Sequence, residues 1–331
     1  MRRISHFQIS HLLIALLACV GLPVSAGCAT ETVKVAVQKT GTFAWELAVI
    51  RAHQLDKQAD ISIDAVELAS PEAGKIALRA GNADIMVSDW LWVSRERALG
   101  AKLTFTPYSS ALGAVMVPAN SPIKTLSDLK GRKLAVAGGP LDKSWLLLQA
   151  SLKRDGIDLK SQAAISYGAP PLLAAKLADG EMDAGLNYWN FCAALEAKGF
   201  RRLTGVEDLL APFGAKGRTA MIGYVFDEDW AGKHRDLVAR FLSVTAKAKE
   251  ILAASDADWQ TIAPLTGAPD DATLRVYRDR YREGIPRRPV AEEETDARIL
   301  YGVLAAIGGR DLVGPSPELS PGTYYRADAR D

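Results

Sequence analysis

The sequence predicts an α/β protein of two lobes, each a mostly parallel sheet flanked by helices, hinged around a central cleft. Short apolar strands alternate with amphipathic helices in two consecutive β-α-β-α-β sets, which occupy residues 32–87 and 133–186. Short loops inside each set favour parallel strands covered by helices on both faces. After residue 229 the pattern is helical only, and helices without strands of their own must pack on an existing lobe.

The first set begins with the apolar run TVKVAV and ends at the sequence SDW. Ser70-Pro71-Glu72 is typical of a helix start, and Gly81-Asn82 of a helix end. Thr42 is expected to cap the first helix. The elements of this set are the strands 32–37, 61–66 and 83–87 and the helices 43–53 and 73–80.

The second set repeats this order of elements. The segment LADGEMDAGL echoes LRAGNADIMV of the first set, which indicates a duplicated architecture rather than a sequence repeat. Its first strand runs through glycines into a helix, in the stretch KLAVAGGPLDKSWLLL. The elements are the strands 133–137, 163–167 and 182–186 and the helices 142–154 and 170–178.

The lobe boundaries follow from the last third of the chain. A return strand, 220–226, precedes the helices 230–254, 270–282 and 291–307, the first of which we expect Asp229 to cap. We expect these helices to return to the first lobe. The sequence therefore predicts lobe 1 from residues 27–112 and 225–331 and lobe 2 from residues 113–224, with two crossings between them.

The N-terminus has the features of a secretory signal peptide. Arg2 and Arg3 precede an apolar run at 12–20, and the small residues 24–26 suit a cleavage site. The apolar run is too short to cross a bilayer. We expect cleavage after residue 26 and export to the periplasm. Cys28 raises the alternative of a lipid anchor, which is less favoured because a serine stands where a lipoprotein signal has an aliphatic residue.

Chain length, charge balance and cysteine content limit the classes of function that this protein can have. Without the signal, 305 of the 331 residues remain, enough for two lobes with a core each. The chain has 40 Lys and Arg against 39 Asp and Glu, and loss of two signal arginines leaves a charge near −1. This balance gives no case for nucleic acid or an acidic membrane surface. Of three cysteines one lies in the signal, so no disulfide framework is expected, and no metal-ligand spacing occurs.

Ligand residues are expected where strands end, because open α/β sheets bind ligands outside the carboxyl ends of their strands. A strand that passes through glycines into a helix also leaves free N–H groups for an anionic or polar group. No nucleotide-binding glycine motif is present. The expected ligand-binding residues are Gln38, Thr40, Gly41, Thr42, Ser88, Asp89, Trp90, Gly139, Asp142, Ser144, Asn187, Tyr188 and Trp189.

Five of the seven tryptophans lie in or just after these strand ends. They predict a cleft lined with flat apolar faces and a few polar groups. The alternative is that each indole packs its own helix onto a sheet. We favour the cleft for Trp90 and Trp189, and leave both readings open for Trp45, Trp92 and Trp145.

Asp89 and Asp142 each allow two interpretations. Either carboxylate could accept hydrogen bonds from a cationic or amide ligand, or could cap the helix that follows it. Lys143 could neutralise an anion or simply be solvated. Catalysis is not favoured, because the histidines outside the signal are His53 and His234, and no hydrolase or metalloprotease motif occurs.

These segments together resemble a known family. The order of VKVAVQKTGTF, ALRAGNADIMVSD, SPIKTLSDLKGRKLAVAGG and LADGEMDAGLNYW is similar to that of NMT1-like periplasmic solute-binding proteins of ABC importers. Members of that family serve nitrate, taurine, aliphatic sulfonates and thiamine precursors. The resemblance implies a type II periplasmic-binding-protein fold that closes on a small molecule.

The resemblance also implies partners. A monomer would deliver its ligand to an inner-membrane ABC permease and its ATPase, with no cofactor and no metal. Asp89 and Asp142 depart from the family pattern, because negative charge where a sulfonate docks opposes an anion. The cysteine-rich motif of the thiamine-pyrimidine synthases is absent. The alternatives are a periplasmic enzyme on the same fold and a sensory or scavenging protein without transport.

Overall fold

The computed structural model describes residues 30–38 and 41–326. The predicted signal peptide (1–26), Cys28 and Thr40 lie outside the described residues. No helix within the described ranges is both long and apolar enough to span a lipid bilayer.

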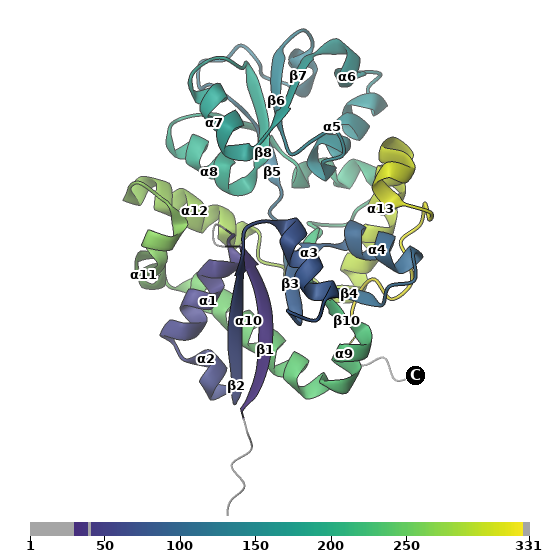
Figure 1. The fold of residues 1–331 in the computed structure, drawn as a ribbon. Coiled ribbons are helices and arrows are strands. Elements are labelled where there is room, and N and C mark those ends of the chain that lie inside the picture. The colour runs from purple at the N-terminus through teal and green to yellow at the C-terminus, as the bar shows by residue number, and fades with distance from the viewer. Residues whose placement is uncertain (1–29, 39–40, 327–331) are drawn as a thin grey trace, which may run out of the picture. The chain divides into compact units, whose positions relative to one another are not determined.

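The first sheet has five strands in the order β2-β1-β3-β10-β4 (Figure 1). β1 pairs in parallel with β2 and β3, whereas β10 runs antiparallel between β3 and β4. Four strands therefore share one direction. The bounds are β1 Glu31–Gln38, β2 Ile61–Leu68, β3 Ile85–Asp89, β4 Leu103–Ser109 and β10 Ile222–Asp227.

The second sheet has the equivalent order, β7-β6-β8-β5-β9. β6 pairs in parallel with β7 and β8, and β5 runs antiparallel between β8 and β9. The predicted architecture of two α/β sheets is confirmed, with one reversed strand in each. The bounds are β5 Gly113–Val117, β6 Lys133–Ala137, β7 Ala164–Gly168, β8 Ala184–Tyr188 and β9 Arg201–Gly205.

The helices follow the predicted order, with additions. α2, α6, α8 and α11 join those that the periodicity predicted, and β9 is an added strand. The bounds are α1 Phe43–Ala52, α2 Leu55–Gln58, α3 Pro71–Arg79, α4 Trp90–Ala98, α5 Lys143–Arg154, α6 Leu159–Gln162, α7 Pro170–Ala178, α8 Trp189–Ala197, α9 Glu228–Lys233, α10 Arg235–Ala254, α11 Asp256–Thr266, α12 Asp271–Glu283 and α13 Val290–Val313.

Two details of the predicted helices are wrong. The helix expected at 230–254 is divided into α9 and α10, because His234 leaves the helical conformation at ψ 37°. Its cap is Asp227 rather than Asp229: the Asp227 Oδ1 accepts the Trp230 N–H at 2.9 Å. Asp227 is the last residue of β10, so the strand turns directly into the helix.

The C-terminal helices contact both halves of the fold. α10 and α11 pack against α1, and α9 against β10, as expected for a return to the first lobe. α12 packs against α8, and α13 against α4 and α5. Two of the helices therefore also join the first half to helices of the second.

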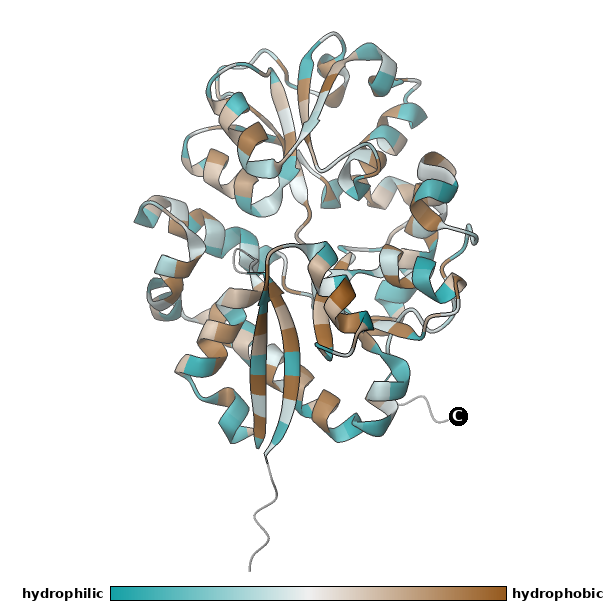
Figure 2. Cartoon of the chain, viewed as in Figure 1, coloured by the Kyte–Doolittle hydropathy of each residue, from teal (hydrophilic) through white to brown (hydrophobic). Residues whose placement is uncertain are grey.

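The cores form where strands are covered on both faces. Val33, Val35, Ala114, Val115 and Met116 are completely buried. Figure 2 shows hydrophobic positions interspersed with hydrophilic ones along β1 and β2 and along the helices, so that each element has apolar side chains for the core and polar ones for its other positions. Residues 110–112 join β4 to β5, and residues 206–221 join β9 to β10. The chain thus passes between the sheets at these two connections.

Candidate functional site

The loop after β1 forms a tight turn before α1. The Gly41 N–H donates to the Gln38 carbonyl at 2.9 Å, and a Cβ on Gly41 would lie 3.2 Å from the same oxygen. Gln38 itself is half-buried and pairs with Leu68 at the end of β2. The turn therefore brings the end of β1 close against the start of α1.

Thr42 occupies the N-cap position of α1 but does not cap it with its side chain, contrary to the prediction. Its backbone is already helical, with φ −68° and ψ −14°, and its Oγ1 lies 3.0 Å from the Tyr108 Oη. Capping requires an extended residue whose oxygen folds back on the helix. Among the described residues the start of α1 has no side-chain acceptor, and its Ala44 and Trp45 N–H groups donate instead to the Gly41 and Thr42 carbonyls, each at 3.1 Å.

A buried polar network lies under α1. The Glu46 carboxylate is fully buried and accepts from the Tyr224 and Tyr281 hydroxyls and the Lys249 ammonium, each at 2.7 Å. Burial lowers the pKa of Lys249, although the Glu46 charge opposes that effect. Lys249 also lies 4.4 Å from the centre of the Tyr108 ring. The network thus connects α1 and α10 to both connecting strands, β4 and β10.

Asp89 and Asp142 are helix caps. The Asp89 Oδ1 accepts the Trp92 N–H at 2.9 Å, and the Asp142 Oδ1 accepts the Ser144 N–H at 2.9 Å. Their second oxygens point elsewhere: the Asp142 Oδ2 accepts from the Tyr188 hydroxyl at 3.3 Å. The capping interpretation is confirmed, and each carboxylate places its own negative charge where an anion would otherwise meet the N–H groups of α4 or α5.

Lys143 joins the two halves of the fold. Its Nζ lies 3.6 Å from the Asp89 Oδ2, so an ion pair connects the start of α5 in the second half to the end of β3 in the first. Burial lowers the pKa of Lys143, but the Asp89 and Asp142 carboxylates outweigh it, and the net pKa lies above its ordinary value. The ammonium is therefore charged at neutral pH, paired with Asp89 and further stabilised by the charge of Asp142.

The glycines after β6 make room for this cluster. Gly138 has φ +85°, and a Cβ there would lie 2.9 Å from the Tyr188 hydroxyl and 3.1 Å from Asp142. Only glycine fits this approach at that φ. Gly139 is half-buried with open space around its Cα, and Ser144 is buried in the first turn of α5.

The residues at the end of β8 have two different roles. Asn187 is buried, with its amide donating to the Pro170 carbonyl at 2.9 Å and its oxygen accepting the Tyr188 N–H at 2.8 Å. Burial, together with the Asp142 charge, raises the pKa of Tyr188. α8 then begins at Trp189 without a side-chain cap. Asn187 is fully used in shaping this end, whereas Tyr188 and Trp189 are half-buried at it.

Trp189 contacts the first half of the fold through aromatic rings. Its ring centre is 5.8 Å from that of Trp45, at an interplanar angle of 84°, and 6.4 Å from that of Tyr281. Edge-to-face geometry at these distances is favourable. Since Trp45 is in the first turn of α1, this contact brings the uncapped starts of α1 and α8 close together.

The remaining tryptophans lie in the core. The structure places Trp90 at 0% exposure, where its indole N–H donates to the Ala220 carbonyl at 3.1 Å, not at an accessible strand end. Trp145 is also fully buried, and Trp92 nearly so. Ser88 lies in β3, two positions before Trp90. It is half-buried and pairs with Gly223 of β10.

The arrangement can hold an anionic head group. Of the helices that begin at strand ends here, α4 and α5 are capped by their own carboxylates, α3 is capped by Ser70, and α7 begins with two prolines. Helix starts whose N–H groups are uncapped attract anions. α8 meets that description, and α1 has no side-chain cap either, although its Ala44 and Trp45 N–H groups have backbone acceptors. The half-buried Trp189 provides an apolar face beside them, with the buried Trp45 packed against it.

Other cavities lie away from these residues. Two grooves, of about 490 and 450 Å³, are lined by none of the residues that the sequence predicted. Within residues 30–38 and 41–326, no three His, Cys, Asp or Glu side chains are grouped so that they could hold a metal ion. Sequence reasoning missed the Glu46–Lys249 pair, which has no local signal because its members lie 203 positions apart.

Two five-stranded sheets of this order, each flanked by helices, define the fold of the periplasmic binding proteins. The aliphatic sulphonate binding protein SsuA from Escherichia coli matches with a TM-score of 0.72 at 22% identity, over 89% of this chain and 92% of that one. The alkanesulfonate-binding protein SsuA from Xanthomonas axonopodis pv. citri, bound to MOPS, matches with a TM-score of 0.67 at 20% identity, over 89% and 98% of the two chains.

The family model "NMT1/THI5 like" matches residues 55–257, which is more than half of the chain, and the chain belongs to this family. A relative from Escherichia coli (strain K12), named an aliphatic sulfonates-binding protein, is 29% identical over 204 residues. That match covers 60% of this chain and 62% of the relative, so it spans less than two thirds of the relative's length.

Proposed function

We propose that this protein is the periplasmic substrate-binding component of an ABC importer. It captures a small organic solute with an anionic head group between the two sheets and delivers it to an inner-membrane permease driven by its ATPase. The family and the sulfonate-binding relatives support this proposal. The observation that carries it is the ring contact between Trp45 and Trp189, which joins α1 and α8, two helices without a side-chain cap, from opposite halves of the fold.

The head group binds to backbone N–H groups at these helix starts. Thr42 and Trp189 are the proposed N–H contacts, and Gln38, Thr40 and Gly41 of the same loop line the site on the first half. Backbone donors and helix dipoles stabilise a sulfonate or carboxylate without a fixed positive side chain. Trp189 contributes an apolar face for the body of the ligand.

A charged cluster lies at the opposite side of the proposed site and consists of Asp89, Asp142 and Lys143. Two carboxylates share one ammonium, and each carboxylate also faces a helix start, so the cluster is close to neutral. We propose that it accepts the polar end of the ligand through the Tyr188 hydroxyl. A second charge on the ligand is tolerated there, as in a zwitterionic sulfonate.

Binding is coupled to movement of the lobes. We assign residues 27–112 and 222–331 to lobe 1 and residues 113–221 to lobe 2, because the predicted boundary at residue 225 would divide β10, all of which pairs in the first sheet. A ligand that contacts both α1 and α8 stabilises the arrangement in which they are close, which is a population shift. No chemical step is required, and a monomer suffices for it.

The test is a ligand panel with a matched pair of variants. Thermal shift and calorimetry are measured with ethanesulfonate, MOPS, nitrate and an alkylamine. A ligand at a hundredfold over its Kd raises the free energy of unfolding by about 2.7 kcal/mol. We expect a sulfonate to bind, Trp189→Ala to weaken it about tenfold, and Trp230→Ala to leave it unchanged.

Trp230 is a suitable control because it is half-buried on α9, against Phe226 and His234, and β10, which precedes α9, ends at the edge of the sheet opposite to the end of β3. Absence of binding by every anion, or equal losses in both variants, would refute the proposed site. Turnover of a bound sulfonate, detected by mass spectrometry of the products, would support the enzyme alternative instead.

A further inference from the structure

A groove of about 450 Å³ lies beside the connections between the two sheets; we call it the hinge groove. It contains none of the residues proposed for the first site. Its lining residues are Ser110, Arg218, Arg282, Glu283, Ile285, Pro286, Arg287 and Arg288.

The hinge groove is built from both connections. Ser110 belongs to the connection between β4 and β5, and Arg218 to the connection between β9 and β10. The other lining residues come from the end of α12 and the segment before α13. The Ser110 N–H donates to the Gly284 carbonyl at 2.9 Å, which fixes the first connection to that segment.

Half of the lining residues are arginines, and several are held in place. The Arg218 Nη1 donates to the Glu283 carbonyl at 3.1 Å, and the Arg282 Nε donates to the Leu252 carbonyl at 3.0 Å. The Arg288 Nη1 donates to the Asp296 Oδ2 at 2.6 Å. Guanidinium groups fixed in this way lose little entropy when they bind an oxyanion.

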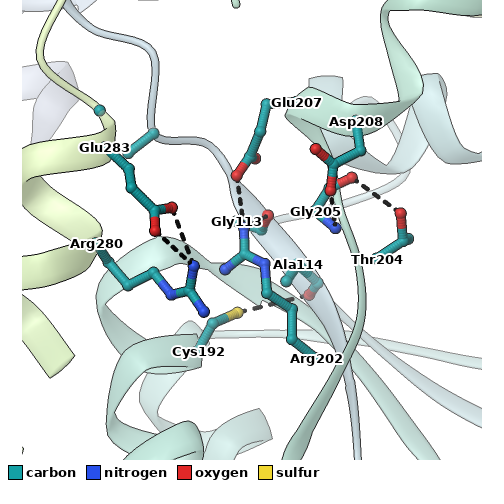
Figure 3. A network of polar contacts seen from close by, with 12 residues as sticks. Gly113, Ala114, Cys192, Arg202, Thr204, Gly205, Glu207, Asp208, Arg280 and Glu283 are labelled. Atoms are coloured by element: carbon teal, nitrogen blue, oxygen red, sulfur yellow. Dashed lines mark hydrogen bonds and ion pairs between the residues drawn. The ribbon is translucent and has the colours of Figure 1, made fainter.

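The acidic group in the lining is already neutralised. The Glu283 carboxylate accepts two hydrogen bonds from the Arg280 Nη1, each at 3.0 Å, and lies 3.7 Å from Arg218. Figure 3 shows this pair beside the Arg202–Glu207 pair of the second half, around the chain at Gly113. The carboxylate therefore presents little repulsion to an anion.

Arg287 provides the available charge. It is exposed, and no carboxylate lies within ion-pair distance of it in the described part of the chain. Asp256 and Asp296, which pair with Arg282 and Arg288, are not lining residues. Three of the four lining arginines already have a carboxylate partner, and Arg287 is the lining guanidinium without one in the described part of the chain. Guanidinium pairs match the geometry of phosphate and carboxylate oxygens.

We propose that the hinge groove is a second ligand site, which binds a small oxyanion with two or more negative charges, such as phosphate or an organic dicarboxylate. Both connections contribute to its walls, so an occupant contacts the segments that must bend when the lobes move. Occupancy then changes affinity at the first site, and the first ligand changes affinity here by the same factor.

The test is calorimetric titration of the full-length protein with inorganic phosphate and, separately, with succinate, at low ionic strength. We expect saturable binding of at least one of them, weakened about tenfold by Arg287→Glu and by Arg218→Gln. The matched control is Arg275→Glu, an exposed arginine of α12 outside the groove, which changes the net charge equally and should leave binding unchanged.

The two probes separate the possible sources of the anion, because phosphate binding alone identifies an inorganic ligand and succinate binding alone an organic one. Failure of both probes to bind, or an equal loss in Arg275→Glu and Arg287→Glu, would overturn the proposal. The titration does not depend on the first site, so its failure leaves the proposed transport function untouched.

Discussion

Glu293 is expected to govern how the stability of this protein depends on pH. Its side chain is 1% exposed in the first turns of α13, and one carboxylate oxygen accepts the Ala220 N–H at 2.6 Å. Burial raises the pKa of Glu293 to about 7 from 4.5, against the opposing effects of the Ala220 N–H and the Arg288 charge. The folded protein therefore retains this proton to higher pH than the unfolded chain does.

The sign and size of the effect follow from this difference. Between pH 4.5 and 7 the folded state binds more protons than the unfolded state, so the free energy of unfolding falls as pH rises. The contribution is fully present below pH 4.5 and is lost above the folded pKa. At about 1.4 kcal/mol per pH unit, the total loss attributable to Glu293 is about 3 kcal/mol.

Glu293→Gln isolates this contribution, because the amide oxygen can still accept the Ala220 N–H but does not titrate. We expect the free energy of unfolding, measured with urea, to change less between pH 4.5 and 8 in the variant than in the native protein. The difference between the two changes should be about 3 kcal/mol. Glu292→Gln, an exposed neighbour on α13, is the control and should follow the native curve. Parallel curves for the native protein and Glu293→Gln would refute the reasoning.

Three further predictions concern buried groups. Glu46→Gln should lower the free energy of unfolding, measured with urea, by about 3–5 kcal/mol, because it leaves the Lys249 ammonium buried without its carboxylate. Adding Lys249→Met to the same chain should recover part of this loss. Gly113→Ala should destabilise by several kcal/mol or abolish expression, since at φ +152° its Cβ would overlap the Asn187 carbonyl, whereas Gly232→Ala, with open space, should not. Burial raises the pKa of Cys192 to about 12, so its thiol should resist alkylation by iodoacetamide at pH 8 until the protein is unfolded; rapid native labelling would contradict its burial.

The elements found from the sequence are those whose signal is local. β1 and β6 are short apolar runs, and α3 begins with a serine followed by proline, so a window of ten residues contains the information. β9 was missed because RRLTG has no apolar alternation, as suits an edge strand. α11 contains Pro264 and was missed for that reason.

The helix caps were partly foreseen for the same reason. The carboxylates of Asp89 and Asp142 act within three residues of their own positions, so sequence alone allowed the capping interpretation. Asp229 was chosen in place of Asp227, since both precede the same apolar pattern and only the end of β10 decides between them. Local chemistry therefore identified the type of group but not always the residue.

Trp90 and Trp189 show what local reasoning lacks. Both follow a strand end immediately, yet Trp90 packs beside Tyr301 of α13 and is fully buried, whereas Trp189 meets Trp45 across the two halves. Their environments differ because α13, from the end of the chain, covers one strand end and not the other. No window around either tryptophan contains that information.

The sequence by itself determined the two α/β sets, the glycine turn before α5 and the polar character of the strand ends, because these depend on residues within one or two turns of each other. Tertiary structure alone decided that Glu46 meets Lys249, that Lys143 pairs with Asp89, and that Trp45 of α1 meets Trp189 of α8. Those contacts join segments tens to hundreds of positions apart, and their energies arise from burial and partial charges that exist only once both sheets have formed.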